Sequence, residues 1–182
     1  YYVLFNWERY AGDFSAIINV RAGGLAVHGG LILCFIVGYM LCKYYKEKFL
    51  DVADLVAPVI ALAQSIGRWG NFFNEEAHGY ATDLPWAQII NGVRYHPTFL
   101  YESIWCFLLF IFLMWFSNNK RAFSGQIICL YAILYSVERF FVESFRTDSL
   151  MVGPLRQAQV ISIVIIIACV ALYILLKKKQ KK

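Results

Sequence analysis

The sequence has 182 residues, of which 60% are hydrophobic and 16% are charged, with a formal net charge of +5. Soluble domains are about half apolar and about a quarter charged, so this composition excludes an ordinary soluble domain and predicts a membrane protein. The basic residues lie beside apolar runs and form no single basic surface, which favours anionic membrane lipid over nucleic acid as the charged partner.

The chain opens on a polar, aromatic stretch. Tyr1 stands where an initiator Met is expected, and residues 1–10 carry neither the basic start nor the small-residue cleavage site of a signal peptide. We therefore expect one or more membrane spans to precede this sequence. Residues 1–182 are predicted to form a single integral membrane domain together with them.

Five apolar segments of near-spanning length predict an all-α, polytopic helical bundle of about five spans. In chain order they are residues 25–42, 52–69, 99–116, 126–142 and 160–176. The second is the least regular, because Pro58, Gln64 and Arg68 interrupt it. A partly re-entrant course is the alternative for that segment.

Basic clusters set the predicted orientation. The lysine-rich tail, residues 177–182, follows the last segment and is expected to be cytoplasmic by the positive-inside rule. Counting back through five alternating spans places residues 118–121 and 43–48 on the same side. The N-terminal loop, the loop of residues 70–97 and the turn of residues 145–154 are then predicted to be extracytoplasmic.

The remaining sequence features argue against metal or cofactor chemistry. The cysteines lie inside apolar runs without close pairing, so we interpret them as packing residues; they are Cys34, Cys42, Cys106, Cys129 and Cys169. No histidine pair has zinc spacing, and the sequence has neither a phosphate-binding glycine loop nor a nucleophile elbow. We expect no bound metal and no cofactor.

A charged stripe ends the fourth segment. Tyr135, Arg139, Glu143 and Arg146 are spaced four, four and three residues apart and are predicted to share one helix face. Charged side chains are costly in lipid unless they face the bundle interior or water. Two guanidiniums with one carboxylate leave a net positive face, which suits bidentate phosphate binding. The alternative is an intrahelical bridge of Glu143 flanked by arginines that reach the headgroups.

A second polar cluster, residues 64–79, ends the second segment. Glycines on both sides of Arg68 let a headgroup approach its guanidinium closely. Asn71 can bind hydroxyl groups, while Glu75 or Glu76 can accept from a hydroxyl or hold an arginine in place. A loop that terminates the helix explains the same glycines and asparagines.

Two stretches contain isolated histidines. Glycines surround His28 at the start of the first segment, so its imidazole is a candidate general base, although a lone histidine is commonly structural. Residues 96–102 begin the third segment, with Pro97 in the first helical turn. We interpret this second stretch chiefly as a helix start.

Together these stretches resemble the prolipoprotein diacylglyceryl transferase family. Residues 67–79, GRWGNFFNEEAHG, are similar to the family signature. Residues 24–30, GLAVHGG, resemble its His-Gly-Gly segment, and residues 96–102, HPTFLYE, its His-Pro-x-x-Leu-Tyr-Glu segment. The spacing of Arg139, Glu143 and Arg146 is similar to its C-terminal arginine motif. The resemblance covers essentially the whole chain, in the family's order.

The resemblance implies a multi-pass enzyme of the bacterial cell membrane with its active site toward the outer face. Such enzymes transfer the diacylglyceryl group of phosphatidylglycerol to the thiol of the lipobox cysteine in a prolipoprotein signal peptide. They release glycerol 1-phosphate in this first step of lipoprotein maturation. The chain is thus expected to be a transferase whose partners are this lipid and this signal peptide.

The same resemblance assigns roles to individual residues. Those expected to bind the substrate are Arg68, Asn71, Glu76, Glu143 and Arg146. Arg139 and Arg68 are expected to stabilise the charge that develops on the leaving phosphate. The attacking thiolate is expected to form either with His28 as the general base or through the nearby positive charge of the arginines, and the sequence leaves both alternatives open.

Two other functions fit parts of the pattern. A phospholipid-binding scaffold or flippase-like transporter would use the same arginines without breaking a bond. An alcohol phosphatidyltransferase would need an array of metal-binding aspartates, and Asp51 and Asp54 lie on the predicted cytoplasmic side without such an array.

Overall fold

The computed structural model describes residues 8, 11, 27–147 and 151–180. The chain divides into two compact units, Tyr1–Phe49 and Leu50–Lys182. The first contains helix α4 (Val27–Tyr44), and the second is built on α5 (Phe49–Phe73), α6 (Thr98–Asn119), α7 (Gln126–Glu143) and α8 (Gln157–Gln180). The predicted helical membrane fold is confirmed, with α5, α6 and α8 long and apolar enough to cross a bilayer.

The helices extend past the apolar segments that predicted them. The segment 52–69 becomes α5 from Phe49 to Phe73, because the backbone stays helical through polar residues such as Asn71. Pro58 lies inside this helix without ending it. The helix is thus continuous across the predicted interruption, and it is long and apolar enough to cross a membrane.

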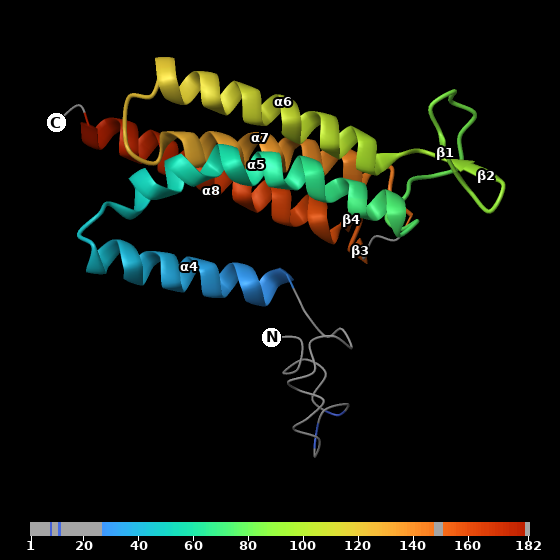
Figure 1. Ribbon diagram of the computed structural model, residues 1–182, viewed down its shortest axis with the longest axis horizontal. Coiled ribbons are helices and arrows are strands. Elements are labelled where there is room, and N and C mark those ends of the chain that lie inside the picture. Colours follow the sequence, from blue (N-terminus) through green and yellow to red (C-terminus); the bar gives the residue numbers. More distant parts are fainter. Residues whose placement is uncertain (1–7, 9–10, 12–26, 148–150, 181–182) are drawn as a thin grey trace. The chain divides into compact units, whose positions relative to one another are not determined.

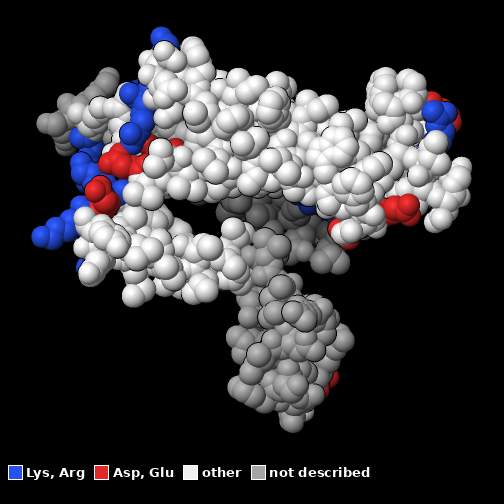
Figure 2. All heavy atoms as spheres, viewed as in Figure 1, with Lys and Arg blue, Asp and Glu red and all other residues white. Residues whose placement is uncertain are grey.

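Helices α5 to α8 run alongside one another as a bundle (Figure 1). Its core contains two alanines from α5, two leucines from α6 and one isoleucine from α7: Ala57, Ala61, Leu109, Leu113 and Ile127. Ala57 and Ala61 are fully buried, so α5 contributes small side chains to this core. Large apolar side chains cover the outside of the bundle, and the charged residues gather at its two ends (Figure 2).

One end of the bundle collects basic residues and is called the basic end below. Gln126 at the start of α7 donates to the hydroxyl of Tyr173 near the end of α8, over 2.9 Å. Arg121 in the loop between α6 and α7 pairs with Asp51 and Asp54 of α5. Lys120, Arg121 and the lysines in the last turn of α8 (Lys177, Lys178 and Lys179) therefore lie at one end, and Lys48 directly precedes α5 in the chain.

The buried carboxylate of Asp54 joins α5 to the start of α7. It is 2% exposed and accepts hydrogen bonds of 2.9 Å from the backbone N–H groups of Gly125 and Ile128. Arg121 Nε donates to it over 3.0 Å. A carboxylate at a helix N-terminus also interacts favourably with the helix dipole.

We expect Asp54→Asn to lower the free energy of unfolding by about 2 kcal/mol, the typical contribution of hydrogen bonds to a charged group. Thermal melting of the purified protein measures this loss. Asp51→Asn is the matched control, because that side chain is 37% exposed and a solvated ion pair contributes less. Equal melting temperatures for the Asp54 variant and the unaltered protein would contradict the prediction.

The opposite end, called the hairpin end, carries two short β-hairpins. Strands β1 (Gln88–Ile90) and β2 (Val93–Tyr95) pair antiparallel, with Gln88 opposite Tyr95. Asn91 and Gly92 connect them with φ values of 51° and 80°, as a tight type I′ turn requires. The smaller hairpin pairs β3 (Met151–Val152) with β4 (Leu155–Arg156). The predicted loop of residues 70–97 therefore contains regular structure.

Candidate active site

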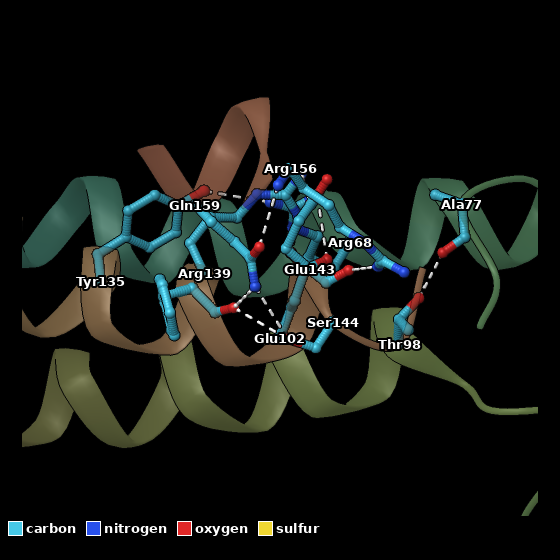
Figure 3. A network of polar contacts seen from close by, with 11 residues as sticks. Arg68, Ala77, Thr98, Glu102, Tyr135, Arg139, Glu143, Ser144, Arg156 and Gln159 are labelled. Carbon is cyan, nitrogen blue, oxygen red and sulfur yellow. Dashed lines mark hydrogen bonds and ion pairs between the residues drawn. The ribbon is translucent and has the colours of Figure 1, made fainter. Parts of the chain in front are cut away.

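Four charged side chains from three helices meet at the hairpin end (Figure 3). Arg68 comes from α5, Glu102 from α6, and Arg139 and Glu143 from α7. Arg68 Nη1 lies 3.2 Å from Glu102 Oε2, and Arg139 Nη1 lies 2.7 Å from Glu102 Oε1. Arg139 Nη2 also lies 2.8 Å from Glu143 Oε2. The glutamates are buried, whereas the two arginine side chains stay about one-fifth exposed at 20% and 21%.

Glu102 is the residue that joins the two arginines, and the sequence interpretation missed it. The stretch that contains it was interpreted as a helix start, yet its side chain is 1% exposed and pairs with arginines from both neighbouring helices. A signal was present, because a carboxylate inside an apolar span is costly unless a partner neutralises it. The partners themselves follow only from the packing of α5 and α7 against α6.

The charge balance of the site differs from the prediction of a net positive face. Arg68 and Arg139 are matched by Glu102 and Glu143, so these four side chains carry no net charge in their ordinary ionised forms. The carboxylates instead hold the guanidiniums in place. Each guanidinium has five N–H donors, and the contacts to carboxylates and to the Tyr135 hydroxyl, 3.2 Å from Arg68 Nη2, use only part of them. Donors therefore remain for an anionic ligand.

Arg146 does not lie on the helix face predicted for it. Helix α7 ends at Glu143, and the backbone N–H of Arg146 donates to the Glu143 carbonyl over 3.2 Å in the turn that follows. An isolated β-bridge pairs Arg146 with Gly79. The expected stripe is thus wrong at its last member, because the chain turns before the next helical turn forms. Arg146 instead lies beside the end of the signature-like stretch.

Two further polar residues cap the end of α7, and the sequence interpretation did not identify them. The Arg156 guanidinium donates to the Glu143 carbonyl and, over 2.6 Å, to the Tyr80 hydroxyl. Gln159 Nε2 donates to the Phe140 carbonyl over 3.3 Å. Positive groups at a helix C-terminus satisfy its free carbonyls and the helix dipole. This cap fixes the turn of α7 that carries Glu143.

Asn71 and Glu76 lie on the hairpin side of Arg68. Asn71 is in the last turn of α5, and its carbonyl accepts from the backbone N–H of Glu76 over 3.1 Å. The exposed Glu76 carboxylate accepts from Asn74 Nδ2 over 3.2 Å. The structure thus links Arg68 to Arg139 through Glu102, and Arg139 contacts Glu143 directly, while Glu76 lies in the loop beyond them.

Gly79 lies where two loops of the hairpin end approach each other closely. A Cβ atom there would lie 2.7 Å from the Cβ of His96 and 3.0 Å from the carbonyl oxygen of Phe145. Its N–H donates to the His96 carbonyl over 2.9 Å, and the next residue, Tyr80, donates to Phe145. Only glycine permits this approach, which ties together the loops that follow α5 and α7.

We expect Gly79→Ala to destabilise the protein by about 2 kcal/mol, because overpacking at a rigid contact with backbone atoms forces the loops apart. Thermal melting provides the measurement. Gly38→Ala in α4 is the control, since its nearest neighbour is 4.0 Å away and alanine favours a helix. Equal melting temperatures for the two variants would refute the expectation.

The three histidines of the chain lie in separate segments. His28 belongs to α4, but its side chain lies outside the described part of the structure. His96 Nδ1 lies 3.2 Å from the Tyr101 hydroxyl, and the His78 ring packs on Tyr95 with 4.3 Å between centroids. Within residues 27–147 and 151–180, no three His, Cys, Asp or Glu side chains are grouped so that they could hold a metal ion.

Comparison with known proteins assigns the whole site to one family. A model of the prolipoprotein diacylglyceryl transferase family matches residues 1–175. The phosphatidylglycerol–prolipoprotein diacylglyceryl transferase of Clostridioides difficile is 55% identical over 181 residues, which cover 100% of this chain and 73% of that protein. The enzyme of the same name from Finegoldia magna is 52% identical over 98% of this chain and 72% of its own length. The one from Bacillus cereus is 48% identical over 99% of this chain and 70% of its own length. The matched residues include every polar side chain from Arg68 to Gln159.

Proposed function

Because the chain belongs to the prolipoprotein diacylglyceryl transferase family and is a transferase, we propose that it modifies bacterial prolipoproteins with lipid. It transfers the diacylglyceryl group of phosphatidylglycerol to the thiol of the lipobox cysteine in the signal peptide, and glycerol 1-phosphate leaves. This reaction is the first step of lipoprotein maturation. It takes place in the cell membrane at the hairpin end of the bundle, which faces outward.

The observation that carries this proposal is the convergence of Arg68 and Arg139 on Glu102 at one end of an apolar bundle. Guanidiniums present N–H groups in a planar arrangement that matches phosphate oxygens. Paired with buried carboxylates, they are oriented before the substrate arrives. Such preorganised donors stabilise charge without the reorganisation that water would need.

The proposed reaction places its largest charge change on the phosphate. The thiolate sulfur attacks the glycerol carbon that carries the phosphoester, so a C–S bond forms and the C–O bond breaks. The bonding electrons move to the phosphate oxygen, and the phosphate gains negative charge in the transition state. Arg68 and Arg139 therefore stabilise the transition state more than the bound lipid, which is the condition for catalysis.

The remaining residues have supporting roles in this proposal. His28 accepts the thiol proton, or the positive charge of the arginines lowers the thiol pKa enough for the thiolate to form. Asn71 and Glu76 bind and orient the glycerol headgroup. Glu143 holds Arg139 in position, and Arg146 shapes the edge of the site.

The charge distribution supports the outward orientation of the site. Lys48, Arg121 and the lysines that end α8 lie at the basic end, and basic residues favour the cytoplasmic side of a membrane. The arginine site is at the opposite end of the same helices. A cysteine-scanning experiment with a membrane-impermeant thiol reagent tests this, since a cysteine in the hairpin should react in intact cells and one beside Lys120 should not.

The activity test uses the full-length protein in nanodiscs with phosphatidylglycerol and a lipobox peptide. Mass spectrometry should detect the peptide with a thioether-linked diacylglyceryl group, and glycerol 1-phosphate should appear in equal amount. A peptide whose cysteine is replaced by serine is the control and should stay unmodified. Retained lipid without any adduct would instead favour the lipid-binding scaffold or transporter, which uses the same arginines without bond cleavage.

A further inference from the structure

A ladder of polar side chains leads from the arginine site into the apolar part of the bundle. Arg68 donates to the Tyr135 hydroxyl over 3.2 Å, and the Tyr135 ring stacks on that of Tyr131 with 5.8 Å between centroids. The Tyr131 hydroxyl donates to Gln64 Oε1 over 2.8 Å. Gln64 and Tyr131 therefore form a second polar layer, one helical turn deeper than Arg68 and Tyr135.

The amide nitrogen of Gln64 is the unused group in this ladder. Its carbonyl oxygen is committed to Tyr131, and no residue of the described part of the chain accepts a hydrogen bond from the nitrogen. An amide donor without a partner is costly in hydrocarbon, where water cannot replace the missing bond. Because the side chain is only half-buried, a bound lipid can reach it.

The positions of Gln64 and Arg68 correspond to two groups of a glycerophospholipid. The residues are four apart in α5, so they share one face and are separated by about 6 Å along the helix axis. In such a lipid the phosphoester and an acyl ester occupy neighbouring carbons of one glycerol, and the acyl ester lies deeper in the bilayer. The ester carbonyl is a hydrogen-bond acceptor, as the Gln64 amide requires.

We propose that Gln64 is a specificity-determining residue that donates from its amide nitrogen to an ester carbonyl of the diacylglyceryl group while the phosphate is bound at Arg68. The proposal rests on the proposed function, because it assumes phosphatidylglycerol as the ligand. It adds that the site recognises the acyl ester itself and not the headgroup alone. Tyr131 orients the amide by holding its carbonyl oxygen.

The test compares phosphatidylglycerol with its diether analogue, which has the same headgroup and chain length but lacks the ester carbonyls. Full-length protein in phosphatidylcholine nanodiscs is offered both lipids in equal amounts, and native mass spectrometry measures the ratio that remains bound. We expect the unaltered protein to prefer the diester about five- to tenfold, the usual effect of one neutral hydrogen bond. Gln64→Met keeps the side-chain size but has no donor, so its ratio should fall to about one.

Two control variants separate recognition from general stability. Ser65→Ala removes the contacts of Ser65 with Ser103 of α6, whereas Gln64 contacts α7, so this variant should lower retention of both lipids equally while keeping their ratio. Tyr131→Phe removes the hydroxyl that orients the Gln64 amide and should reduce the ratio only in part.

Either of two results would overturn the inference: an unchanged ratio in Gln64→Met, or no diester preference in the unaltered protein. In both cases Gln64 would serve only to support Tyr131. The binding measurement needs no turnover, so it separates this inference from the proposed function. A diester preference that depends on Gln64, together with no thioether adduct, would support the ester contact and refute the transferase proposal.

Discussion

Arg139→Lys should lower the rate of diacylglyceryl transfer about 100-fold, the typical loss when one preorganised donor to a developing negative charge is removed. Lysine keeps the positive charge but loses the planar arrangement of N–H groups. Arg139 contacts Glu102 and Glu143 through two different nitrogens, 2.7 Å and 2.8 Å away. A single ammonium group cannot hold both carboxylates and still present donors to a phosphate. Arg68→Lys is expected to have a similar effect.

The measurement is the initial rate of adduct formation by mass spectrometry, at saturating phosphatidylglycerol so that the chemical step is observed. Arg94→Lys is the matched control, because Arg94 is exposed in strand β2 and should tolerate the change. Melting temperatures show whether each variant is folded. Full transfer rates in both Arg139→Lys and Arg68→Lys would refute the phosphate-binding role of these arginines.

Glu102→Gln should destabilise the protein by about 3 kcal/mol, in the range expected when one member of a buried ion pair is removed. The carboxylate is 1% exposed and neutralises Arg68 and Arg139 together. Without it, Arg68 loses its ion pair with α6, and Arg139 keeps only its pair with Glu143 among the ion pairs of the described residues. Transfer should also fall strongly, because both arginines lose the group that orients them.

A double variant tests this interpretation of Glu102. Glu102→Gln combined with Arg68→Gln removes both members of one pair, so it should recover part of the stability that Glu102→Gln loses, although not the activity. Glu47→Gln is the control for loss of one carboxylate at an exposed position. Thermal melting that shows simple additivity of the two single losses would contradict the proposed pairing.

The ends of the helices show how far local sequence patterns reach. Apolar runs located all the helices of the second unit, and the run 126–142 matches α7 to within one residue. Helix α5, however, continues past its run to Phe73, and α7 ends before Arg146, the last member of the predicted charged stripe. Hydropathy reports where a helix meets lipid and not where its hydrogen bonds end. The end of α7 depends on Arg156 and Gln159, which donate hydrogen bonds to the last carbonyls of this helix. Both residues are distant in sequence from the charged residues of α7.

The β1–β2 hairpin was predictable but was not predicted. Asn91-Gly92 is a strong signal for a type I′ turn, and residues of high strand propensity flank it on both sides, Ile89 and Ile90 before it and Val93 after it. The position of this stretch between two apolar segments indicates only a connection between membrane spans, which does not by itself predict strands. For Gly79 the sequence offers no comparable signal, since its need for glycine arises from contacts with His96 and Phe145.

The sequence by itself determined the membrane class, the helical bundle, the basic end and the candidate arginines. These properties depend on the length of apolar runs and on charges close to them, both of which are local. Only the tertiary structure decided that Glu102 joins Arg68 to Arg139, that Arg146 leaves the helix face and that Gln64 has an unused donor. Those facts depend on which helix faces lie against one another, and residue spacing within a single helix does not contain that information.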